Sequence, residues 1–290
     1  MVLGAGAGAG LALASATQPV PWAVLFVLGC LAAMALLGWW DDHEPLSARL
    51  RLFVQLFLVG GVVIALGVPG QVAFGGVVVL LPALVIGALM VLAGAWLVNL
   101  TNFMDGIDGI AGIQGVVACG YLGLLLFHPF AAAGDQETRQ LAALGLVTSI
   151  ACVGFLGWNW PPARIFMGDI GSTFLGLVFV VEIVGLLVRA CPLEVALLPL
   201  FPFVADATCT LARRALRRER LSTAHRTHLY QRLARAWGSH QLVTLLYGGI
   251  AAAGAAGAEL TRRGMLPGGA AVVLLALGYG ALVWYARGRG

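Results

Sequence analysis

Polar side chains are concentrated in residues 99–109, which read Asn-Leu-Thr-Asn-Phe-Met-Asp-Gly-Ile-Asp-Gly between two long apolar segments. Asp105 and Asp108 supply carboxylates, and Asn99 and Asn102 supply carboxamides. In a helix, residues three apart share a face, so each pair would present its polar groups together. Acidic groups are costly beside hydrocarbon. The cluster therefore predicts a site for a hard cation such as Mg²⁺, a ligand or water.

A second cluster, Asp41-Asp42, closes an apolar segment behind Trp39-Trp40. Adjacent aspartates point in different directions on a helix, so we expect them to do different jobs. Two like charges this close raise each other's pKa unless a cation lies nearby. We interpret the pair as a general base or a phosphate or metal site. The alternative is a solvated helix end behind an aromatic belt.

A third cluster surrounds Asp169, which precedes Gly171-Ser172-Thr173 at the predicted start of a helix. The backbone N–H groups of such a helix start can receive a phosphate oxygen, and Asp169 could hold its metal. Arg164 could contact phosphate through two hydrogen bonds. The alternative is that Asp169 is a simple helix N-cap.

Residues 212–239 form a strongly basic loop with two histidines. Most of its arginines fit positive charge held at a cytoplasmic face, where they also meet anionic lipid headgroups. We set His225, Arg226 and His228 apart as candidates for contact with a phosphate or leaving group.

Composition predicts a polytopic, all-α transmembrane bundle. Of 290 residues, 60% are hydrophobic and 10% are charged, whereas soluble domains carry about 25% charged residues. Apolar segments of roughly 20 residues recur to the C-terminus, which excludes an outer-membrane barrel. We expect nine spans in a single domain, 1–290, with the weakly hydrophobic segment 3–17 as a tenth or partial span. The nine cover about residues 20–39, 51–68, 76–98, 109–127, 141–158, 171–189, 193–211, 240–258 and 268–286.

Arginine counts predict the orientation. If the loops are numbered alternately, thirteen of the seventeen basic residues fall in one set and four in the other. The positive-inside rule makes the larger set cytoplasmic. All four polar clusters belong to that set, so we expect one cytoplasmic site. Two acids, Glu182 and Asp206, fall inside spans and should face the bundle interior, with Arg213 as a candidate ion-pair partner for Asp206.

Together these segments resemble the polyprenyl-phosphate N-acetylhexosamine-1-phosphate transferases of glycosyltransferase family 4. The wording of the motifs is most similar to the O-antigen-initiating branch, a relative of the phospho-MurNAc-pentapeptide translocase. The resemblance covers about residues 5–245. Its motifs are Leu37-Gly-Trp-Trp-Asp-Asp42, the pattern N-x-x-N-x-x-D-G-x-D-G over 99–109, and Arg164-Ile-Phe-Met-Gly-Asp-Ile-Gly-Ser172.

The chain departs from the family pattern in two places. The family usually has a first span and a Pro-Arg-Gly-Gly-Gly segment ahead of the present N-terminus, so we expect either that the start of the chain is assigned late or that the chain is a shortened variant. The family's H-x-H-H motif aligns with His228-Leu-Tyr-Gln231, which keeps only the first histidine. His225-Arg226 is the candidate substitute.

The resemblance implies an enzyme of a bacterial inner membrane with its active site facing the cytoplasm. It would transfer N-acetylhexosamine-1-phosphate from a UDP-sugar to undecaprenyl phosphate, release UMP and so initiate a lipid-linked glycan, lipopolysaccharide O-antigen in particular. Mg²⁺, with Mn²⁺ as the alternative ion, would be held by Asp169 and Asn102. The expected catalytic residues are Asp41, Asp42, Asp105 and Asp108. The expected substrate-binding residues are Asn99, Arg164, His225, Arg226 and His228.

The expected partners are the lipid bilayer, undecaprenyl phosphate and a UDP-N-acetylhexosamine, and not nucleic acid; a homo-oligomer is left open. Two alternatives remain from the sequence. One is a transporter or flippase for an anionic lipid, whose mark would be charges along a mid-membrane path. The other is a catalytically inactive scaffold, suggested by the missing N-terminal segment.

Overall fold

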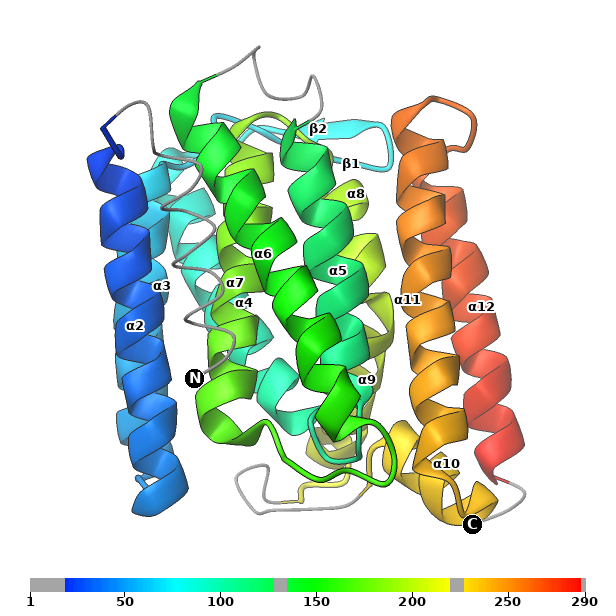
Figure 1. Ribbon diagram of the computed structural model, residues 1–290. Helices are drawn as coiled ribbons and strands as arrows, with labels where there is room; N and C mark the ends of the chain where they lie inside the picture. Colours follow the sequence, from blue (N-terminus) through cyan, green and yellow to red (C-terminus); the bar gives the residue numbers. More distant parts are fainter. Residues whose placement is uncertain (1–18, 128–134, 220–226, 288–290) are drawn as a thin grey trace.

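The computed structural model of the chain describes residues 19–127, 135–219 and 227–287. Within these ranges, nine helices are long and apolar enough to cross a membrane by length and composition. The helices run alongside one another in one bundle (Figure 1). The prediction of a nine-span, all-α bundle is therefore confirmed. The segment 3–17 lies outside the described residues.

The helices follow one another along the chain. Their bounds are α2 Trp22–His43, α3 Ala48–Leu66, α4 Ala83–Phe103, α5 Ile110–Phe127, α6 Gln136–Asn159, α7 Gly168–Val188, α8 Leu193–Leu197, the 3₁₀ helix η1 Leu198–Leu200, α9 Phe201–Leu216, α10 Leu229–Trp237, α11 His240–Arg262 and α12 Gly268–Arg287.

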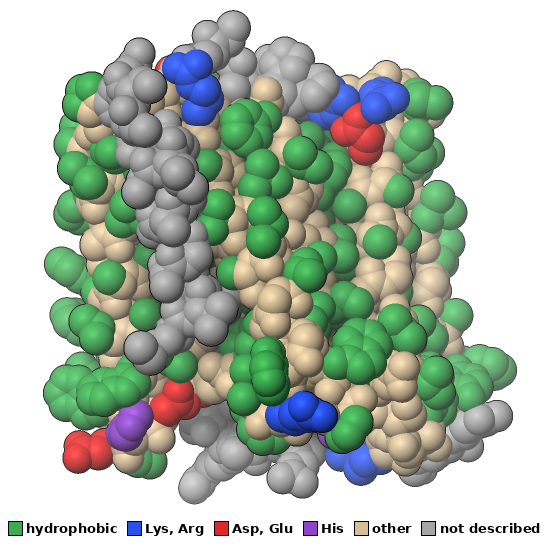
Figure 2. All heavy atoms as spheres, in the orientation of Figure 1, with side chains coloured by type: hydrophobic (Ala, Val, Ile, Leu, Met, Phe, Trp, Pro, Cys, Tyr) green, Lys and Arg blue, Asp and Glu red, His purple; other side chains and the backbone are tan. Residues whose placement is uncertain are grey.

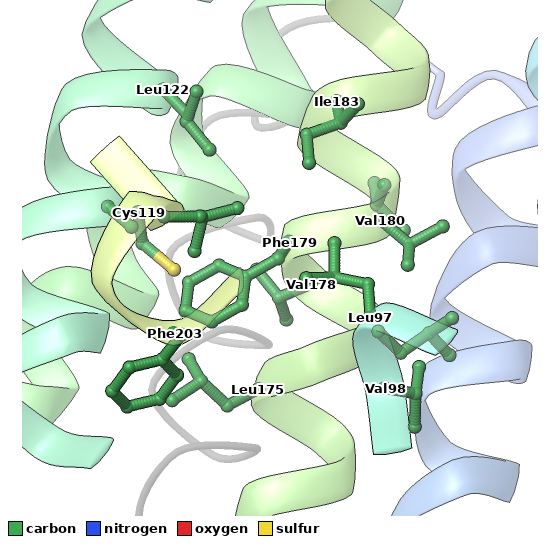
Figure 3. Packing of buried hydrophobic residues seen from close by; sticks show 14 of the residues in the cluster. Leu97, Val98, Cys119, Leu122, Leu175, Val178, Phe179, Val180, Ile183 and Phe203 are labelled. Carbon is green, nitrogen blue, oxygen red and sulfur yellow. The ribbon is translucent and has the colours of Figure 1, made fainter. Parts of the chain in front are cut away.

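Helix α7 is the centre of the bundle, and it packs against α2, α3, α4, α5 and α6. Every side chain from Ser172 to Leu187 is buried, as expected for a helix that is apolar all round. Figure 3 shows Phe179 of α7 among side chains from α4, α5 and α9. Five neighbouring helices thus hold α7 in place, and the first turn of this helix carries Asp169.

The predicted span 76–98 begins too early. Residues Val72–Phe74 (β1) and Val77–Val79 (β2) form an antiparallel hairpin with Val72 opposite Val79, and α4 starts only at Ala83. The turn is Gly75-Gly76, both at positive φ (59° and 83°), which suits a two-residue hairpin turn. Hydropathy alone does not separate a β-branched apolar strand from the start of an apolar helix.

The predicted span 193–211 is interrupted. It consists of α8, η1 and α9, with Pro199 in η1 and Pro202 in the first turn of α9. Proline has no backbone N–H and breaks a continuous helix. The span as a whole, Leu193–Leu216, still has the length and hydropathy to cross a membrane.

On the face drawn in Figure 2, the coloured charged side chains lie toward the two ends of the bundle, and many apolar side chains lie between them. The C-terminal end of α2, the α4–α5 and α6–α7 connections and α10 all lie at the same end (Figure 1). The polar clusters at Asp41, 99–109, Asp169 and His228 belong to these segments. Their predicted convergence on one end of the bundle is confirmed.

Candidate functional site

The Asp42 carboxylate, at the end of α2, accepts hydrogen bonds from two backbone N–H groups at the start of α7. Asp169 N lies 2.9 Å from Asp42 Oδ1, and Ile170 N lies 3.1 Å from Asp42 Oδ2. The first N–H groups of a helix have no partner within the helix and favour negative charge. Asp42 therefore joins α2 to the residue expected to bind a metal.

The phosphate site expected at Gly171 is wrong in its position. Helix α7 begins at Gly168, three residues earlier than predicted, and Gly171 N donates to Met167 O at 3.3 Å. The N–H groups that do open the helix are taken by Asp42. Asp169 lies in the first turn, and the N-cap position belongs to Met167, so the alternative of Asp169 as a simple N-cap is also wrong.

Asp41 pairs with Arg51 on α3. Arg51 Nη1 lies 2.5 Å from Asp41 Oδ2 and 3.5 Å from Asp169 Oδ2. Leu46 N donates to the other oxygen of Asp41 at 2.7 Å. The Asp41 side chain is 6% exposed and that of Arg51 is 37% exposed. A partly buried cation thus lies between two carboxylates, and the two adjacent aspartates have different partners.

Asn102, in the last turn of α4, reaches the same carboxylate. Its Nδ2 donates to Asp169 Oδ1 at 2.8 Å and to Ser172 Oγ at 3.0 Å. The two residues expected to hold a metal are therefore in direct contact, although 67 residues separate them in the chain.

A pocket opens beside these residues, with a cavity volume of about 250 Å³. Its walls come from the end of α4, the α4–α5 connection, the end of α6 and the start of α7. The lining residues are Asn102, Asp105, Gly106, Ile107, Asp108, Asn159, Phe166, Met167, Gly168 and Asp169. Four predicted site residues, Asn102, Asp105, Asp108 and Asp169, thus line one cavity.

Negative charge is concentrated around this cavity. Burial, followed by the negative charges of Asp169 and Asp42, raises the pKa of the Asp105 carboxyl well above its usual range. Like charges that face each other in a partly desolvated site disfavour ionisation of each member. The cavity wall is therefore suited to a cation that would neutralise the carboxylates.

Asp108, on the cavity wall, connects the α4–α5 connection to the α6–α7 connection and to α11. Its Oδ2 accepts a hydrogen bond from Ala163 N at 3.2 Å and lies 3.3 Å from Nδ1 of His240, the first residue of α11. Its backbone O accepts from Thr244 Oγ1 at 2.7 Å. Beside it, Asn159 Oδ1 accepts from Gly109 N at 2.8 Å, and Gly109 needs its positive φ of 78° to make this turn.

Two predicted substrate-binding residues are placed outside the cavity lining. Asn99 donates to Gln55 Oε1 at 2.5 Å and to Ala95 O at 2.8 Å, so it connects α4 to α3. Arg164 is exposed, and its guanidinium carbon lies 6.0 Å from the ring centre of Trp158. Substrate contact by either side chain stays a prediction.

His228 lies at the N-cap position of α10 with only 2% of its side chain exposed. Its Nδ1 is 3.4 Å from Asp206 Oδ1, and its ring stacks on that of Tyr230 with centroids 5.8 Å apart. Contact of His228 with a substrate stays a prediction. His225 and Arg226 lie outside the described residues.

The residues of the site fit a magnesium ion that is shared with a substrate. Within the described ranges, no three carboxylate, imidazole or thiol side chains are grouped closely enough to hold a metal by themselves. Mg²⁺ is commonly held by one or two carboxylates, with waters and substrate phosphates completing its shell. Asp169 and Asn102 supply oxygens of the right kind, and the excess negative charge around Asp105 favours a cation.

Three residues at or beside the site were not among the predicted site residues: Arg51, Gln55 and His240. Arg51 and Gln55 could have been found from the sequence, because both are polar residues in the first turns of a predicted span. They are four positions apart and therefore share one helix face. His240 had no comparable signal, because its contact with Asp108 spans 132 positions (240 − 108).

Comparison with known proteins finds matches over the part of the chain that carries most of the site. Residues 24–186, more than half of the chain, match the sequence model described as glycosyl transferase family 4. That range contains both Asp41-Asp42 and Asp169, and it includes the whole α4–α5 connection.

Individual relatives share about a third of their aligned residues with the chain. A Bacillus subtilis protein named probable undecaprenyl-phosphate N-acetylglucosaminyl 1-phosphate transferase is 30% identical over 218 residues, covering 72% of this chain and 58% of the relative. A Chlamydia muridarum phospho-N-acetylmuramoyl-pentapeptide-transferase is 34% identical over 178 residues, 53% of this chain and 51% of the relative. A Mycolicibacterium gilvum protein of that name is 31% identical over 183 residues. The chain thus spans 51% to 58% of the length of these relatives.

Proposed function

The chain belongs to glycosyl transferase family 4, and on that premise we propose that it transfers a phosphosugar to a polyprenyl phosphate. The donor is a UDP-N-acetylhexosamine and the acceptor is undecaprenyl phosphate. An oxygen of the acceptor phosphate attacks the sugar-side phosphorus of the donor. The bond from that phosphorus to the bridging oxygen breaks, UMP leaves with the bridging oxygen, and the sugar-1-phosphate stays on the lipid as a diphosphate.

One observation carries this proposal: Arg51, Asp41, Asp42, Asn102 and Asp169 form one connected set, and two of its members, Asn102 and Asp169, line the cavity. Phosphoryl transfer depends on positioning and charge stabilisation more than on covalent chemistry by the protein. A fixed set of carboxylates with one cation, beside a cavity, supplies both for a diphosphate. The acceptor's phosphate lies at the membrane surface, which is where the ends of these helices are.

The residues divide the work between the two substrates. Arg51 is 37% exposed and faces Asp41 and Asp169, so it can approach the acceptor phosphate and stabilise charge on the reacting oxygens. Asp41 holds Arg51 and is the candidate to orient the acceptor or take up its proton. Asp105 and Asp108, on the cavity wall, are the candidates for contact with the nucleotide sugar.

Mg²⁺, or Mn²⁺ as the alternative, is part of this proposal. When bound, the ion would neutralise charge on the donor diphosphate. Asp169 and Asn102 would hold it. Asp42 holds the backbone of Asp169 by accepting a hydrogen bond from its N–H group. Gly38, which has no side chain, lets the backbone of α2 contact the backbone of α7 at Asp169 and Ile170. If Asp169→Asn leaves turnover within about twofold of wild type, this assignment is wrong.

The proposed pathway is O-antigen initiation on the cytoplasmic face of a bacterial inner membrane. The orientation is supported by the arginine asymmetry, because the site lies at the arginine-rich end of the bundle. The wording of the second and third motifs supports the O-antigen branch. The Bacillus subtilis relative is named for N-acetylglucosaminyl 1-phosphate and the Chlamydia muridarum relative for phospho-N-acetylmuramoyl-pentapeptide. Which N-acetylhexosamine this chain uses is therefore determined by assay.

The flippase alternative is not favoured by the two acids inside the spans. Asp206 accepts hydrogen bonds from α9, α10 and α11. Glu182 is fully buried and packs against Gly145 of α6. The carboxylate of Asp206 thus joins three helices, and Glu182 is enclosed by packed helices, so neither acid lies along an open path through the described part of the bundle.

The test is a turnover assay on the purified chain in detergent or nanodiscs. The protein is incubated with Mg²⁺, undecaprenyl phosphate and one of a panel of UDP-N-acetylhexosamines, and UMP is measured. We expect UMP release with one donor of the panel, dependent on the lipid. Undecaprenol, which has no phosphate, is the matched control acceptor. UMP release that is equal without lipid, or absent with every donor, contradicts the proposal.

A further inference from the structure

Helix α10 is anchored by the buried Asp206 carboxylate of α9. Leu229 N and Tyr230 N, at the start of α10, lie 2.8 and 2.9 Å from its two oxygens. Tyr247 of α11 donates its hydroxyl at 2.6 Å, and Thr210 of α9 donates at 3.1 Å. Arg213, the partner expected from the sequence, instead donates to Thr227 O at 3.3 Å. The charge of Asp206, 0% exposed, is thus used to fix where α10 begins.

Tyr230, the second residue of α10, reaches from this anchor to the α4–α5 connection. Its hydroxyl donates to Phe103 O at 2.9 Å, at the end of α4. Gln231 Nε2 donates to the same hydroxyl at 3.1 Å. The hydroxyl also lies directly against Gly106, where an added Cβ would collide with it. Asp105 stands between these two contact points in the chain.

The chemistry of the Tyr230 hydroxyl suits a permanent donor. Burial, followed by the charges of Asp206 and Asp105, raises the pKa of Tyr230 far above its usual range. The proton therefore stays on the oxygen at every pH at which a membrane enzyme works, and the bond to Phe103 O persists. The contact with Gly106 leaves no room for the connection to move toward α10.

We propose that Tyr230 is a positioning residue that sets the Asp105 carboxylate in the cavity by holding the backbone on both sides of it, with Asp206 as the fixed anchor of α10. This rests on the proposed phosphosugar transfer and deepens it. Tyr230 does not touch the reacting atoms. It acts on the donor side of the site, because the acceptor-side pair of Asp41 and Arg51 comes from α2 and α3.

The kinetic test compares the deletion of two buried tyrosine hydroxyls, one bonded to the end of α4 and one bonded to Asp206. Tyr230→Phe removes the bond to Phe103 O and keeps the ring, whereas Tyr247→Phe removes a bond to Asp206 without touching the α4–α5 connection. For Tyr230→Phe we expect kcat/KM for the UDP-sugar to fall about tenfold, as for the loss of one hydrogen bond. The KM for undecaprenyl phosphate should stay within about twofold. Tyr247→Phe should keep both values within about twofold per folded molecule.

The structural test is suppression of a steric clash. Gly106→Ala puts a methyl group against the Tyr230 hydroxyl, with Tyr230 Cζ and Gln231 Nε2 each 3.1 Å away. Adding Tyr230→Phe to Gly106→Ala removes the closest atom. We expect the double variant to melt at a higher temperature than Gly106→Ala alone, and to recover at least about threefold in kcat/KM.

The outcomes separate this inference from the proposed function. If wild type releases no UMP, the proposed function fails, and the melting temperatures alone decide whether Tyr230 holds the connection. If wild type is active, equal effects of Tyr230→Phe and Tyr247→Phe overturn the inference. So does a double variant that melts no higher than Gly106→Ala, since the hydroxyl would then not fix the connection.

Discussion

The contact between α2 and α7 at Gly38 offers a sharp steric test of the site. A Cβ at Gly38 would lie 2.5 Å from Asp169 O and 2.6 Å from both Asp169 C and Ile170 Cα. These are backbone atoms of the first turn of the central helix, so they cannot swing aside as a side chain would. Gly38→Ala therefore requires α2 and α7 to separate by on the order of 0.5–1 Å to restore normal contact distances.

This separation acts directly on the two hydrogen bonds made one turn later by Asp42. Their lengths of 2.9 and 3.1 Å would grow to about 3.4–4.1 Å, beyond the useful range for N–H to oxygen bonds. At about 0.5–1.5 kcal/mol net for each bond, the free energy of unfolding should fall by about 1–3 kcal/mol. Displacing Asp169 by up to about 1 Å should lower turnover on the order of 100-fold.

The matched control is Gly29→Ala on the same helix, where an added Cβ meets nothing within 4 Å. Replacing an exposed helical glycine with alanine should stabilise by up to about 1 kcal/mol. Thermal unfolding and lipid-dependent UMP release are measured for both variants. If Gly38→Ala retains the turnover of Gly29→Ala, the close approach of α2 to Asp169 does not hold the site, and the reasoning fails.

Three further perturbations test the charges. Arg51→Gln should lower the free energy of unfolding by about 1–2 kcal/mol, since the cation is partly exposed. It should also lower turnover at least about tenfold, whereas Arg51→Lys should retain more turnover. Equal turnover of both variants and wild type contradicts this. Burial and the charges of Asp169 and Asp42 raise the pKa of Asp105, so its stability contribution is complete below the ordinary aspartate pKa of about 3.9 and lost as pH rises through the raised value. Asp105→Asn should therefore lose turnover yet melt above wild type at pH 8, with the gap closing toward pH 4; a gap independent of pH refutes this. Added Mg²⁺ should raise the melting temperature of wild type more at pH 8 than at pH 5, because protonated carboxyls bind cations poorly, and a rise of the same size in Asp169→Asn excludes that residue as a ligand.

The bundle and the location of the site were predictable because they depend on patterns that act along the chain. Apolar segments of span length must cross or pack, and arginine asymmetry assigned the loops to two sides. Those two rules alone placed Asp41, residues 99–109 and Asp169 at one end, where the structure has them.

The partners within the site were less predictable, because they depend on how helices are rotated against each other. Asp42 was expected to act on a substrate, and it receives two N–H groups of α7. Arg51 was not among the predicted site residues, and it pairs with Asp41. The sequences around Asp42 and Asp169 do not indicate that Gly38 lets α2 and α7 come close enough for Asp42 to reach these N–H groups.

The hairpin and the broken span show a different limit. Val77–Val79 are apolar and β-branched, so a hydropathy window merges them with the helix that follows. The adjoining Gly75-Gly76 pair was the available signal for a tight turn. Likewise, Pro199 and Pro202 marked the interruption between α8 and α9.

The central claim is that a sugar and its phosphate move together to the lipid. The most direct measurement uses a UDP-N-acetylhexosamine with radiolabelled phosphorus in the sugar-side phosphate, together with undecaprenyl phosphate and Mg²⁺. Phosphosugar transfer predicts label in the organic-phase lipid product, with unlabelled UMP released in equal amount. Label recovered in UDP, with only the sugar on the lipid, would contradict the account.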